Sequence, residues 1–468
     1  MQIDERRIAS IVEQVVASLK SGQPQATPKP AAEGLGVYPT VDEALTRAAQ
    51  AQREFSGLSL AKRKKIIEAI RQAGIDNAQY FARITHEETR LGRYEDKIQK
   101  NINAATLSPG MEVLEHRVIG GDEGVTIIER VPFGVIVSIL PTTHPTPFVI
   151  NHAIIMLAGG NAVFFCPHPR AEKCTRTAIT VLNKAIVEAG GPADLLTVLD
   201  HVSMDAVNAA CAHPLTSLIT AAGGAGVVKM ALSCGKKAIV AGPGNPPVVV
   251  DETADLTQAA RDIVAGASFD NNILCIAEKE VFVVEAVFDQ FMQELSKTNT
   301  YILRDKQQIE QLTKILVEDG HINRELVGQN PERILGEIGI QVGPEVRLVA
   351  FETDFSHPLV MIEQMLPVIP IVRARDFDDA LDMAVKAEQR MGHTAVIHSR
   401  DIQRITRFTQ RLRTGLTVAN GPSGAALGVG GAAEFAHTIA DPTGEGIVTA
   451  KHFTREHRLT INGALKLA

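Results

Sequence analysis

Between residues 134 and 240, short apolar segments alternate with segments of helical periodicity, and this alternation restricts the fold more than any other feature of the chain. The apolar segments are GVIVSIL (134–140), NAVFFC (161–166), LLTVL (195–199), SLIT (217–220) and AIV (238–240). The helical segments lie near 148–157, 171–189, 203–211 and 225–233. Buried strands that alternate with helices predict a doubly wound parallel sheet, in which ligands bind at the carboxyl ends of the strands.

A second unit of the same kind is expected further along the chain. Its strand-like segments include PPVVV (246–250), EVFVV (280–284), VIPIV (368–372) and TAVIHS (394–399), with helical segments between them. The sequence therefore predicts an α/β protein with two doubly wound domains.

These patterns also predict where the domains begin and end. The first domain is expected over residues 35–245 and the second over 246–418. The final segment, 419–468, is glycine-rich and then strand-like. We expect it to return to the first domain and to form an oligomerisation arm together with residues 110–130, because a late strand without a core of its own must pair with another strand.

The N-terminal segment differs from the rest of the chain. Residues 1–20 carry apolar side chains at three- and four-residue spacing, which predicts an amphipathic helix. Residues 21–34 are rich in Pro, Ala and Gly without periodicity, which predicts a linker. A helix of this length cannot bury its apolar stripe alone, so it docks on its own body, on a sister subunit or on another protein.

The net charge and the cysteine content argue against several classes of protein. The formal net charge is -7 with both signs interspersed, which argues against binding to nucleic acid. The five cysteines are scattered without a C-x-x-C pair, which is typical of reduced thiols and argues against a metal site. No apolar run approaches the ~20 residues of a membrane span. Neither a nucleic acid nor a membrane is therefore expected as a partner.

The segment FDNNILCIAEKE (269–280) places Cys275 among apolar and amide side chains. It is one of many stretches, from about residue 37 to 453, in which the chain resembles the CoA-acylating aldehyde dehydrogenases of bacterial microcompartments. The others include GRYEDKIQKN (92–101), PFGVIVSILPTTHPT (132–146), GGNAVFFCPHP (159–169), AGPGNPPVVVDETADL (241–256), EQMLPVIPIV (363–372), GHTAVIHSR (392–400) and PTGEG (442–446). The resemblance implies an aldehyde dehydrogenase fold, with a Rossmann-like cofactor domain first and a catalytic domain second.

The resemblance implies that Cys275 is the nucleophile, whereas a cysteine without this context is more often a small buried apolar residue. Its thiolate would attack the aldehyde, and the hydride of the hemithioacetal would pass to the nicotinamide. The Cys275 backbone N–H and a group from PTTHP (141–145), with Thr143 as the candidate, would stabilise the oxyanion. His393 matches a family histidine, and it is either a proton acceptor for CoA or Cys275 or a structural residue.

The resemblance also implies an NAD site, with NADP as the alternative, and coenzyme A as co-substrate. Glu363 matches the glutamate that holds the nicotinamide ribose, the alternative being a solvated acid at a helix end. Pro167 and His168 replace the lysine that meets the adenosine ribose in hydrolysing relatives. The full set of candidate cofactor-binding residues is Leu140, Pro141, Thr142, Pro167, His168, Gly223, Gly224 and Glu363.

Two departures bear on the reaction and the substrate. No Asp or Glu occurs between residues 206 and 250, where hydrolysing aldehyde dehydrogenases place the carboxylate that activates water. Without this carboxylate, the acyl group would react with a thiol rather than with water, which favours a CoA-acylating enzyme over a hydrolysing one. Cys275 and Glu363 are retained, which argues against an inactive shell-associated scaffold. His144 stands where the family commonly has Asn, and it either lines the pocket wall or hydrogen-bonds a substrate hydroxyl.

The expected substrate is therefore a short aldehyde. Propionaldehyde is the first expectation, and lactaldehyde and acetaldehyde are the alternatives. The resemblance further implies a homodimer or a dimer of dimers in the lumen of a bacterial microcompartment. Residues 1–20 would serve as an encapsulation tag that binds a shell or core protein.

Overall fold

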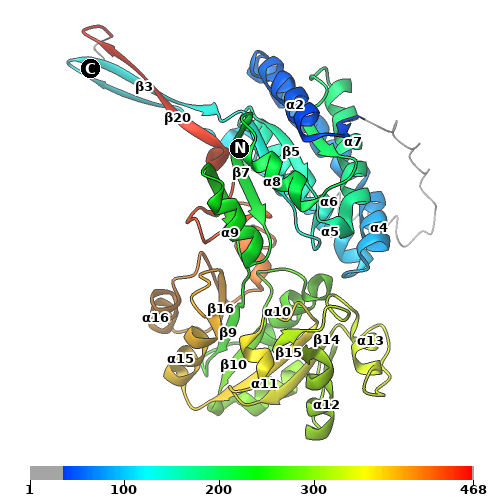
Figure 1. Cartoon of the computed structure of the whole chain (residues 1–468). Helices are drawn as coiled ribbons and strands as arrows, with labels where there is room; N and C mark the ends of the chain where they lie inside the picture. Colours follow the sequence, from blue (N-terminus) through cyan, green and yellow to red (C-terminus); the bar gives the residue numbers. More distant parts are fainter. Residues whose placement is uncertain (1–34, 466–468) are drawn as a thin grey trace.

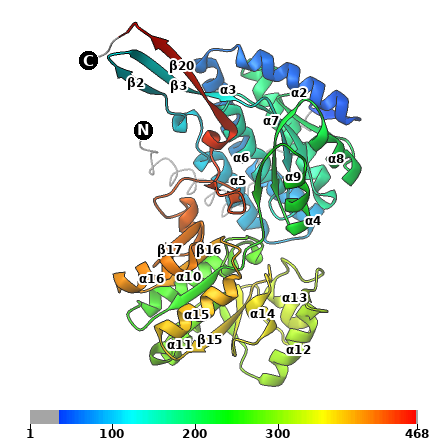
Figure 2. The same cartoon turned by 60° about the vertical axis from the view of Figure 1, so that its left-hand side comes forward.

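The computed structural model describes residues 35–465, so the predicted helix 1–20 and linker 21–34 lie outside the described residues. Figures 1 and 2 show two α/β units, one above the other, and a long arm that projects from the upper unit. Each unit contains one parallel sheet, which confirms the predicted pair of doubly wound α/β units. Within the described part of the chain, no helix is long and apolar enough to cross a membrane.

The upper unit contains six parallel strands in the order β1-β6-β5-β4-β7-β8. Their bounds are β1 Val37–Tyr38, β4 Val135–Ile139, β5 Ala162–Cys166, β6 Leu196–Leu199, β7 Thr216–Ala222 and β8 Lys237–Ala241. Every residue of β4 and of β5 is buried, which explains why the sequence shows continuous apolar runs there rather than alternation. The strand order reverses at β4, which lies between β5 and β7.

Helices cover this sheet, and one of them is buried on all sides. α6 (Pro145–Ala158) lies between the sheet and outer helices, so all its residues are buried. The other helices are α2 Val41–Ser56, α3 Leu60–Asp76, α4 Ala78–Thr89, α5 Tyr94–Leu107, α7 Glu172–Glu188, α8 Met204–Ala212 and α9 Ala225–Ser233. Side-chain caps from Thr40, Ser59 and Ser203 begin α2, α3 and α8 by accepting backbone N–H groups of the first turn.

The lower unit contains seven parallel strands in the order β11-β14-β15-β10-β9-β16-β17. Their bounds are β9 Pro247–Val250, β10 Glu280–Val284, β11 Thr300–Ile302, β14 Leu348–Thr353, β15 Val368–Ala374, β16 Thr394–His398 and β17 Leu416–Ala419. The helices are α10 Leu256–Ser268, α11 Phe288–Leu295, α12 Lys306–Leu316, α13 Pro331–Gly336, α14 Pro358–Met361, α15 Phe377–Glu388 and α16 Ile402–Leu412.

Alternation along the central strands builds two cores in the lower unit. Val248 and Val250 of β9 pack in one hydrophobic cluster with α10 and α11, whereas Val249 packs in another with α15 and α16. Successive side chains of a strand point to opposite faces, so each face of the sheet receives half of the apolar residues. Strand β9 is therefore buried on both sides, as its PVVV sequence requires.

The arm is an antiparallel sheet of β2 (Arg117–Gly121), β3 (Gly124–Pro132) and β20 (Thr454–Asn462). In Figures 1 and 2, β20 runs along β3, and its register extends from Thr454 opposite Pro132 to Asn462 opposite Gly124. The late strand thus pairs with an earlier strand of its own chain, and its pairing with another subunit stays a prediction. Two short antiparallel pairs, β12 Val317–Glu318 with β13 His321–Ile322 and β18 Ile439–Ala440 with β19 Gly446–Ile447, complete the strands described.

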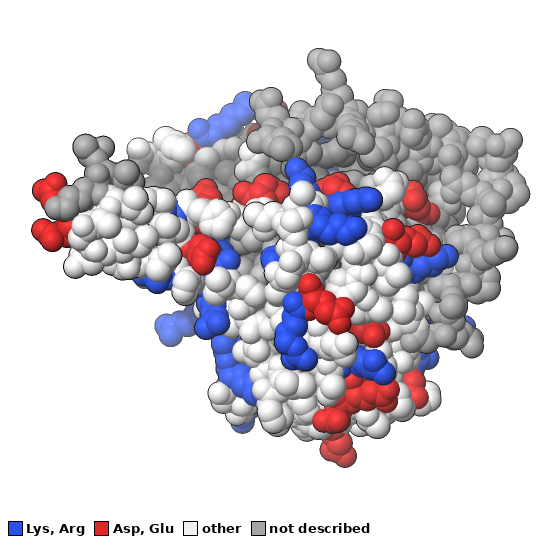
Figure 3. Space-filling view, turned by 90° about the horizontal axis from the view of Figure 1, so that it is seen from above, with Lys and Arg blue, Asp and Glu red and all other residues white. Residues whose placement is uncertain are grey.

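The surface carries charges of both signs. On the described part of the face shown in Figure 3, acidic and basic side chains are interspersed. This distribution agrees with the interspersed charges of the sequence.

Candidate active site

The predicted cofactor residues of the first unit lie at the carboxyl ends of neighbouring strands. Leu140, Pro141 and Thr142 follow β4, Pro167 and His168 follow β5, and Gly223 and Gly224 follow β7. Because β4 pairs with both β5 and β7, these three loops meet at the point where the strand order reverses. Open α/β sheets bind ligands at such a point, so the topology brings these predicted residues together.

The loop after β7 fits close approach of a ligand to the backbone. Gly224 is the N-cap of α9, whose first N–H groups have no partner within the helix. A side chain at Gly224 or at Gly226 would meet no other atom within 4 Å, so the space beside this turn is open. A helix N-terminus with an open approach suits a phosphate group.

The loop that carries the nucleophile has an unusual backbone. Between α10 and Cys275, three consecutive residues have positive φ: Asp270 (47°), Asn271 (54°) and Asn272 (64°). This conformation costs an L-residue roughly 1 kcal/mol, so surrounding contacts must hold it. Asn271 Nδ2 donates to Gly328 O and Asn330 Oδ1, and Asn272 Nδ2 donates to Ala267 O and Glu278 O at 2.7 and 2.9 Å.

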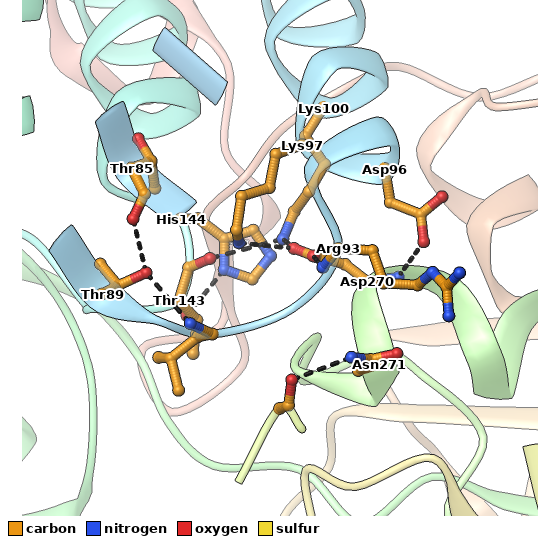
Figure 4. A network of polar contacts seen from close by, with 12 residues as sticks. Thr85, Thr89, Arg93, Asp96, Lys97, Lys100, Thr143, His144, Asp270 and Asn271 are labelled. Atoms are coloured by element: carbon orange, nitrogen blue, oxygen red, sulfur yellow. Dashed lines mark hydrogen bonds and ion pairs between the residues drawn. The ribbon is translucent and has the colours of Figure 1, made fainter. Parts of the chain in front are cut away.

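Asp270 is held by two lysines of α5, as Figure 4 shows. Its Oδ2 accepts from Lys97 Nζ at 3.1 Å and from Lys100 Nζ, and its Oδ1 accepts the Arg93 N–H at 2.7 Å. Burial raises the pKa of Asp270, but the two ammonium groups outweigh burial and the pKa lies below its ordinary value. Burial also lowers the pKa of Lys100 to about 8.

Lys100 connects the nucleophile loop with the loop after β4. Besides Asp270, its Nζ reaches the carbonyl oxygen of Thr143 at 3.4 Å. The hydroxyl of Thr143 lies 2.7 Å from His144 Nδ1 (Figure 4). Thr143, the predicted oxyanion residue, is therefore fixed through its carbonyl group and through its side chain. Lys100 contacts Thr143 and Asp270, which come from segments far apart in the sequence, so no single local motif revealed this connection.

One glycine of the segment between the two sheets, Gly244, lies against Cys275, Glu363 and His393. A Cβ on Gly244 would lie 2.7 Å from the Cys275 carbonyl oxygen and 2.9 Å from His393 Cγ. The Gly244 N–H donates to Glu363 Oε1 at 3.2 Å. The structure thus brings together three residues that the sequence analysis singled out, and it leaves no room for a side chain at position 244.

The thiol of Cys275 is protonated in this environment at neutral pH. Burial raises its pKa to about 12, the charge of Glu363 adds to the rise, and the Lys279 ammonium opposes it. A proton acceptor is therefore needed before the sulfur can attack as a thiolate.

His393 has the properties of such an acceptor. It is buried, and burial lowers its pKa to about 4, so the imidazole is neutral at pH 7. Its Nδ1 lies 2.8 Å from Thr394 Oγ1 and 3.8 Å from Asp441 Oδ2, while Nε2 has no hydrogen-bond partner among the described residues. A proton on Nδ1 can be donated to Thr394 Oγ1 on the side that faces the Asp441 carboxyl group, and it leaves the lone pair on Nε2 available.

Asp441 was missed by the sequence analysis. Burial raises its pKa to about 7, and Glu388 adds to the rise. It directly precedes the PTGEG segment (442–446), which was the only local signal of its importance. Its position beside His393 depends on the return of the chain from the lower unit, which spacing in the sequence does not show.

His144 contributes an aromatic face rather than a charge. Burial lowers its pKa well below the ordinary value, so the ring is neutral. It contacts Phe148 and His437, with ring centroids 6.1 and 5.7 Å apart. His144 thus lies beside the Thr143 hydroxyl at the edge of an aromatic cluster.

Glu363 is able to hold two ribose hydroxyl groups. Its carboxylate is half-buried, this burial raises its pKa, and its one hydrogen bond within the described structure comes from the Gly244 N–H. The remaining lone pairs suit the hydroxyl donors of a nicotinamide nucleotide. In the described ranges, no group of three or more His, Cys, Asp or Glu residues could hold a metal ion.

A family model supports the assignment. Residues 35–434 match the model of the aldehyde dehydrogenase family. Over 472 residues, the chain is 41% identical to the acetaldehyde dehydrogenase (acetylating) EutE of Escherichia coli, covering 99% of this chain and all of that relative.

Solved structures agree. A propionaldehyde dehydrogenase from the fucose utilisation bacterial microcompartment of Clostridium phytofermentans is 41% identical with a TM-score of 0.91, covering 93% of this chain and 100% of that one. The Rhodopseudomonas palustris propionaldehyde dehydrogenase with bound CoA and an acylated cysteine is 40% identical with a TM-score of 0.91, covering 92% and 99%. The chain belongs to the aldehyde dehydrogenase family, and within it to the CoA-acylating aldehyde dehydrogenases.

Proposed function

We propose that this protein oxidises propionaldehyde to propionyl-CoA with NAD(P)⁺, through a thioester on Cys275. The observation that carries the proposal is the packing of Gly244 against Cys275 and His393. The segment between β8 and β9 approaches the nucleophile and contains no carboxylate. Position 244 within it has no room for a side chain. A thioester formed there is protected from water and reacts with a thiol.

The residues of the site account for each step. The Cys275 sulfur forms a bond to the aldehyde carbon, and its proton passes to His393 Nε2. The Cys275 N–H and the loop around Thr143 stabilise the oxygen that becomes negative. When bound, NAD(P)⁺ supplies the oxidant that takes the hydride from the hemithioacetal carbon. After releasing its proton, His393 accepts the thiol proton of CoA, whose sulfur then displaces Cys275 from the acyl group.

Several residues would hold the dinucleotide. The loops after β4, β5 and β7 meet along its expected path, and Glu363 would bind the nicotinamide ribose. The loop after β5 is Pro167–His168, with no acidic side chain to repel a 2′-phosphate. This composition accommodates both NAD and NADP.

A hydrolysing enzyme is the second candidate, because Asp441 is a carboxyl group near the nucleophile in addition to Glu363, which is assigned to the ribose. Asp441 contributes to the raised pKa of Cys275 and has its own pKa near 7. It is, however, 3.8 Å from His393 Nδ1, beyond hydrogen-bond distance but close enough for its charge to favour a proton on that nitrogen. We therefore assign it to His393 rather than to a water molecule.

The decisive experiment follows NADH with and without CoA. Without CoA, aldehyde and NAD⁺ should yield a burst of about one NADH per active site and then stop, because water attack is slow. CoA should restore steady turnover, and Cys275→Ala should show neither phase. Steady formation of free acid without CoA would contradict the proposal and favour hydrolysis.

The choice of aldehyde is tested with His144. Propionaldehyde should have the highest kcat/KM, and acetaldehyde and lactaldehyde are the competing substrates. His144→Asn should lower kcat/KM for lactaldehyde more than for propionaldehyde if the imidazole binds a hydroxyl. A higher kcat/KM for acetaldehyde or lactaldehyde than for propionaldehyde in the wild type would overturn the assignment.

We also propose that the protein works inside a bacterial microcompartment, with residues 1–20 binding a shell or core protein. The predicted amphipathic pattern of that segment and the microcompartment source of one solved relative support this location.

A further inference from the structure

Lys279 is a buried cation beside the nucleophile that the reaction above does not use. It lies four residues after Cys275, directly before β10, and its side chain is fully buried. Its Nζ donates to the carbonyl oxygens of Asn272 and Leu274, at 3.0 and 3.2 Å, and to Asn272 Oδ1. The side chain therefore points back into the loop that carries Cys275.

These three contacts match the chemistry of an ammonium group. Burial lowers the pKa of Lys279 to about 8, and the nearby charge of Glu363 opposes this effect. An ammonium has three N–H donors, and here three oxygen atoms accept them. The group is therefore charged in the resting site and lies within the field of both Cys275 and Glu363.

The backbone of Lys279 is tied to the other parts of the site. Its N–H donates to Pro246 O at 3.1 Å, in the segment that contains Gly244. Its carbonyl accepts from Gln364 Nε2 at 2.9 Å, next to Glu363. The ammonium is thus held in fixed geometry relative to the two segments that surround the nucleophile.

The contact with Leu274 determines the direction of one N–H group. The Leu274–Cys275 peptide is trans, so its carbonyl and its N–H point in opposite directions. Because Lys279 holds the carbonyl, the Cys275 N–H points to the other side, toward its own sulfur. An oxygen that becomes negative on the carbon attached to that sulfur lies near this donor.

We propose that Lys279 is a positioning residue: it aims the Cys275 N–H at the hemithioacetal oxygen and places a positive charge beside the sulfur as it becomes a thiolate. This inference rests on the nucleophile assigned above. The start of the loop has other supports, namely Asp270 with its two lysines and the Asn272 amide contacts. The loop therefore keeps its fold when the Lys279 side chain is altered.

The test separates the charge from the geometry. Lys279→Met removes both, Lys279→Arg keeps the charge but not the three contacts, and Glu278→Gln is the matched control. Glu278 is the adjacent buried carboxyl group, which accepts from the N–H and hydroxyl of Ser423 at 2.8 and 2.9 Å, and its side chain does not bond to the loop. Two quantities are measured: the rate at which iodoacetamide alkylates Cys275, followed by mass spectrometry, and the rate of the NADH burst.

Alkylation is measured from about pH 6 to about pH 10, without aldehyde or CoA. Because the pKa of Cys275 lies above this range, the readout is the alkylation rate at each pH. Lys279→Met should lower this rate about tenfold at pH 7 and slow the burst about 100-fold, with NAD⁺ affinity unchanged by calorimetry. Lys279→Arg should keep the wild-type alkylation profile and still slow the burst. Glu278→Gln should change neither quantity.

Wild-type alkylation and burst in Lys279→Met would overturn the inference, as would an equal loss in Glu278→Gln. If circular dichroism showed that Lys279→Met does not fold, Lys279→Arg decides, because a wild-type burst in that variant excludes the positioning role. Failure of the nucleophile assignment looks different: Cys275→Ala would then retain NADH formation. The positioning role of Lys279 and the nucleophile role of Cys275 are therefore tested by different variants and can fail independently.

Discussion

Glu363 is a half-buried carboxylate that accepts one hydrogen bond within the described structure, from the Gly244 N–H, and this leaves it able to bind a ligand. An acid held so loosely by its own chain has lone pairs left for hydroxyl groups of a nucleotide. It lies beside Cys275, whose ionisation it opposes. One side chain therefore affects both the dinucleotide and the nucleophile.

Glu363→Gln should lower the rate of hydride transfer by about 10- to 100-fold, because the ribose and with it the nicotinamide lose their fixed position. The melting temperature should change little. Stopped-flow measurement of the NADH burst, together with a thermal melt, checks both. A collapse in melting temperature with unchanged activity per folded molecule would show that the residue is structural.

Burial of His152, on α6, makes the free energy of unfolding depend on pH. Its nitrogens lie 2.8 Å from Ser138 Oγ and 2.8 Å from Thr438 Oγ1, and burial lowers its pKa to about 3. The unfolded chain binds a proton at this residue near pH 6.5, so the neutral folded form contributes stability above that pH. The contribution is lost as the pH falls through the window between the two values.

The free energy of unfolding of the wild type relative to His152→Gln should therefore decrease between pH 7 and about pH 5. Urea titrations of both proteins at each pH measure the difference. A difference independent of pH would mean that the imidazole is not held neutral.

At the scale of elements, α5 and the nucleophile loop are joined by ionic contacts. Lys97 and Lys100 of α5 share the carboxylate of Asp270, which follows α10. This joins the upper unit to the lower one within a few residues of Cys275. The strained backbone of Asp270–Asn272 is maintained by contacts from outside the loop, as conformations of this kind require.

Asp270→Asn should lower the free energy of unfolding by about 3 kcal/mol, because two buried ammonium groups lose their counter-charge. A variant that also carries Lys97→Met and Lys100→Met should recover part of this stability but not the NADH burst, since the Thr143 carbonyl loses its contact. Urea unfolding and burst kinetics distinguish the two effects. Full activity in the triple variant would show that the ionic contacts serve stability alone.

At the scale of the whole molecule, the N-terminal segment should be separable from the enzyme. Deletion of residues 1–34 should leave the kinetic constants and the melting temperature nearly unchanged, because the predicted linker would span about 20 Å as a flexible coil and would present the predicted helix away from the body. A reporter fused to residues 1–20 should enter a cognate microcompartment. A truncated enzyme that dissociates, with a reporter left in the cytosol, would make the segment an oligomerisation element.

The sequence predicts the strands of this molecule better than it predicts the site. Continuous apolar runs such as β4 and β9 are buried on both faces, so composition alone identifies them. Cys275, Glu363 and His393 were found because each lies in a motif. Asp270 and Lys279 lie in the same motif as Cys275 but were not singled out, because the motif does not show their partners: Asp270 pairs with α5, and Lys279 folds back onto the preceding loop. Asp441 was not found because its position beside His393 depends on the return of the chain to the upper unit.

The return of the chain to the upper unit has a consequence for synthesis on the ribosome. Phe435, Ile439, Val448 and Phe453 belong to the hydrophobic core of the upper unit, and β20 completes its arm. The lower unit, residues 247–419, has all its strands before these residues emerge. The upper unit, which begins first, is therefore completed after the lower unit, and its core stays incomplete on the ribosome until these residues have emerged.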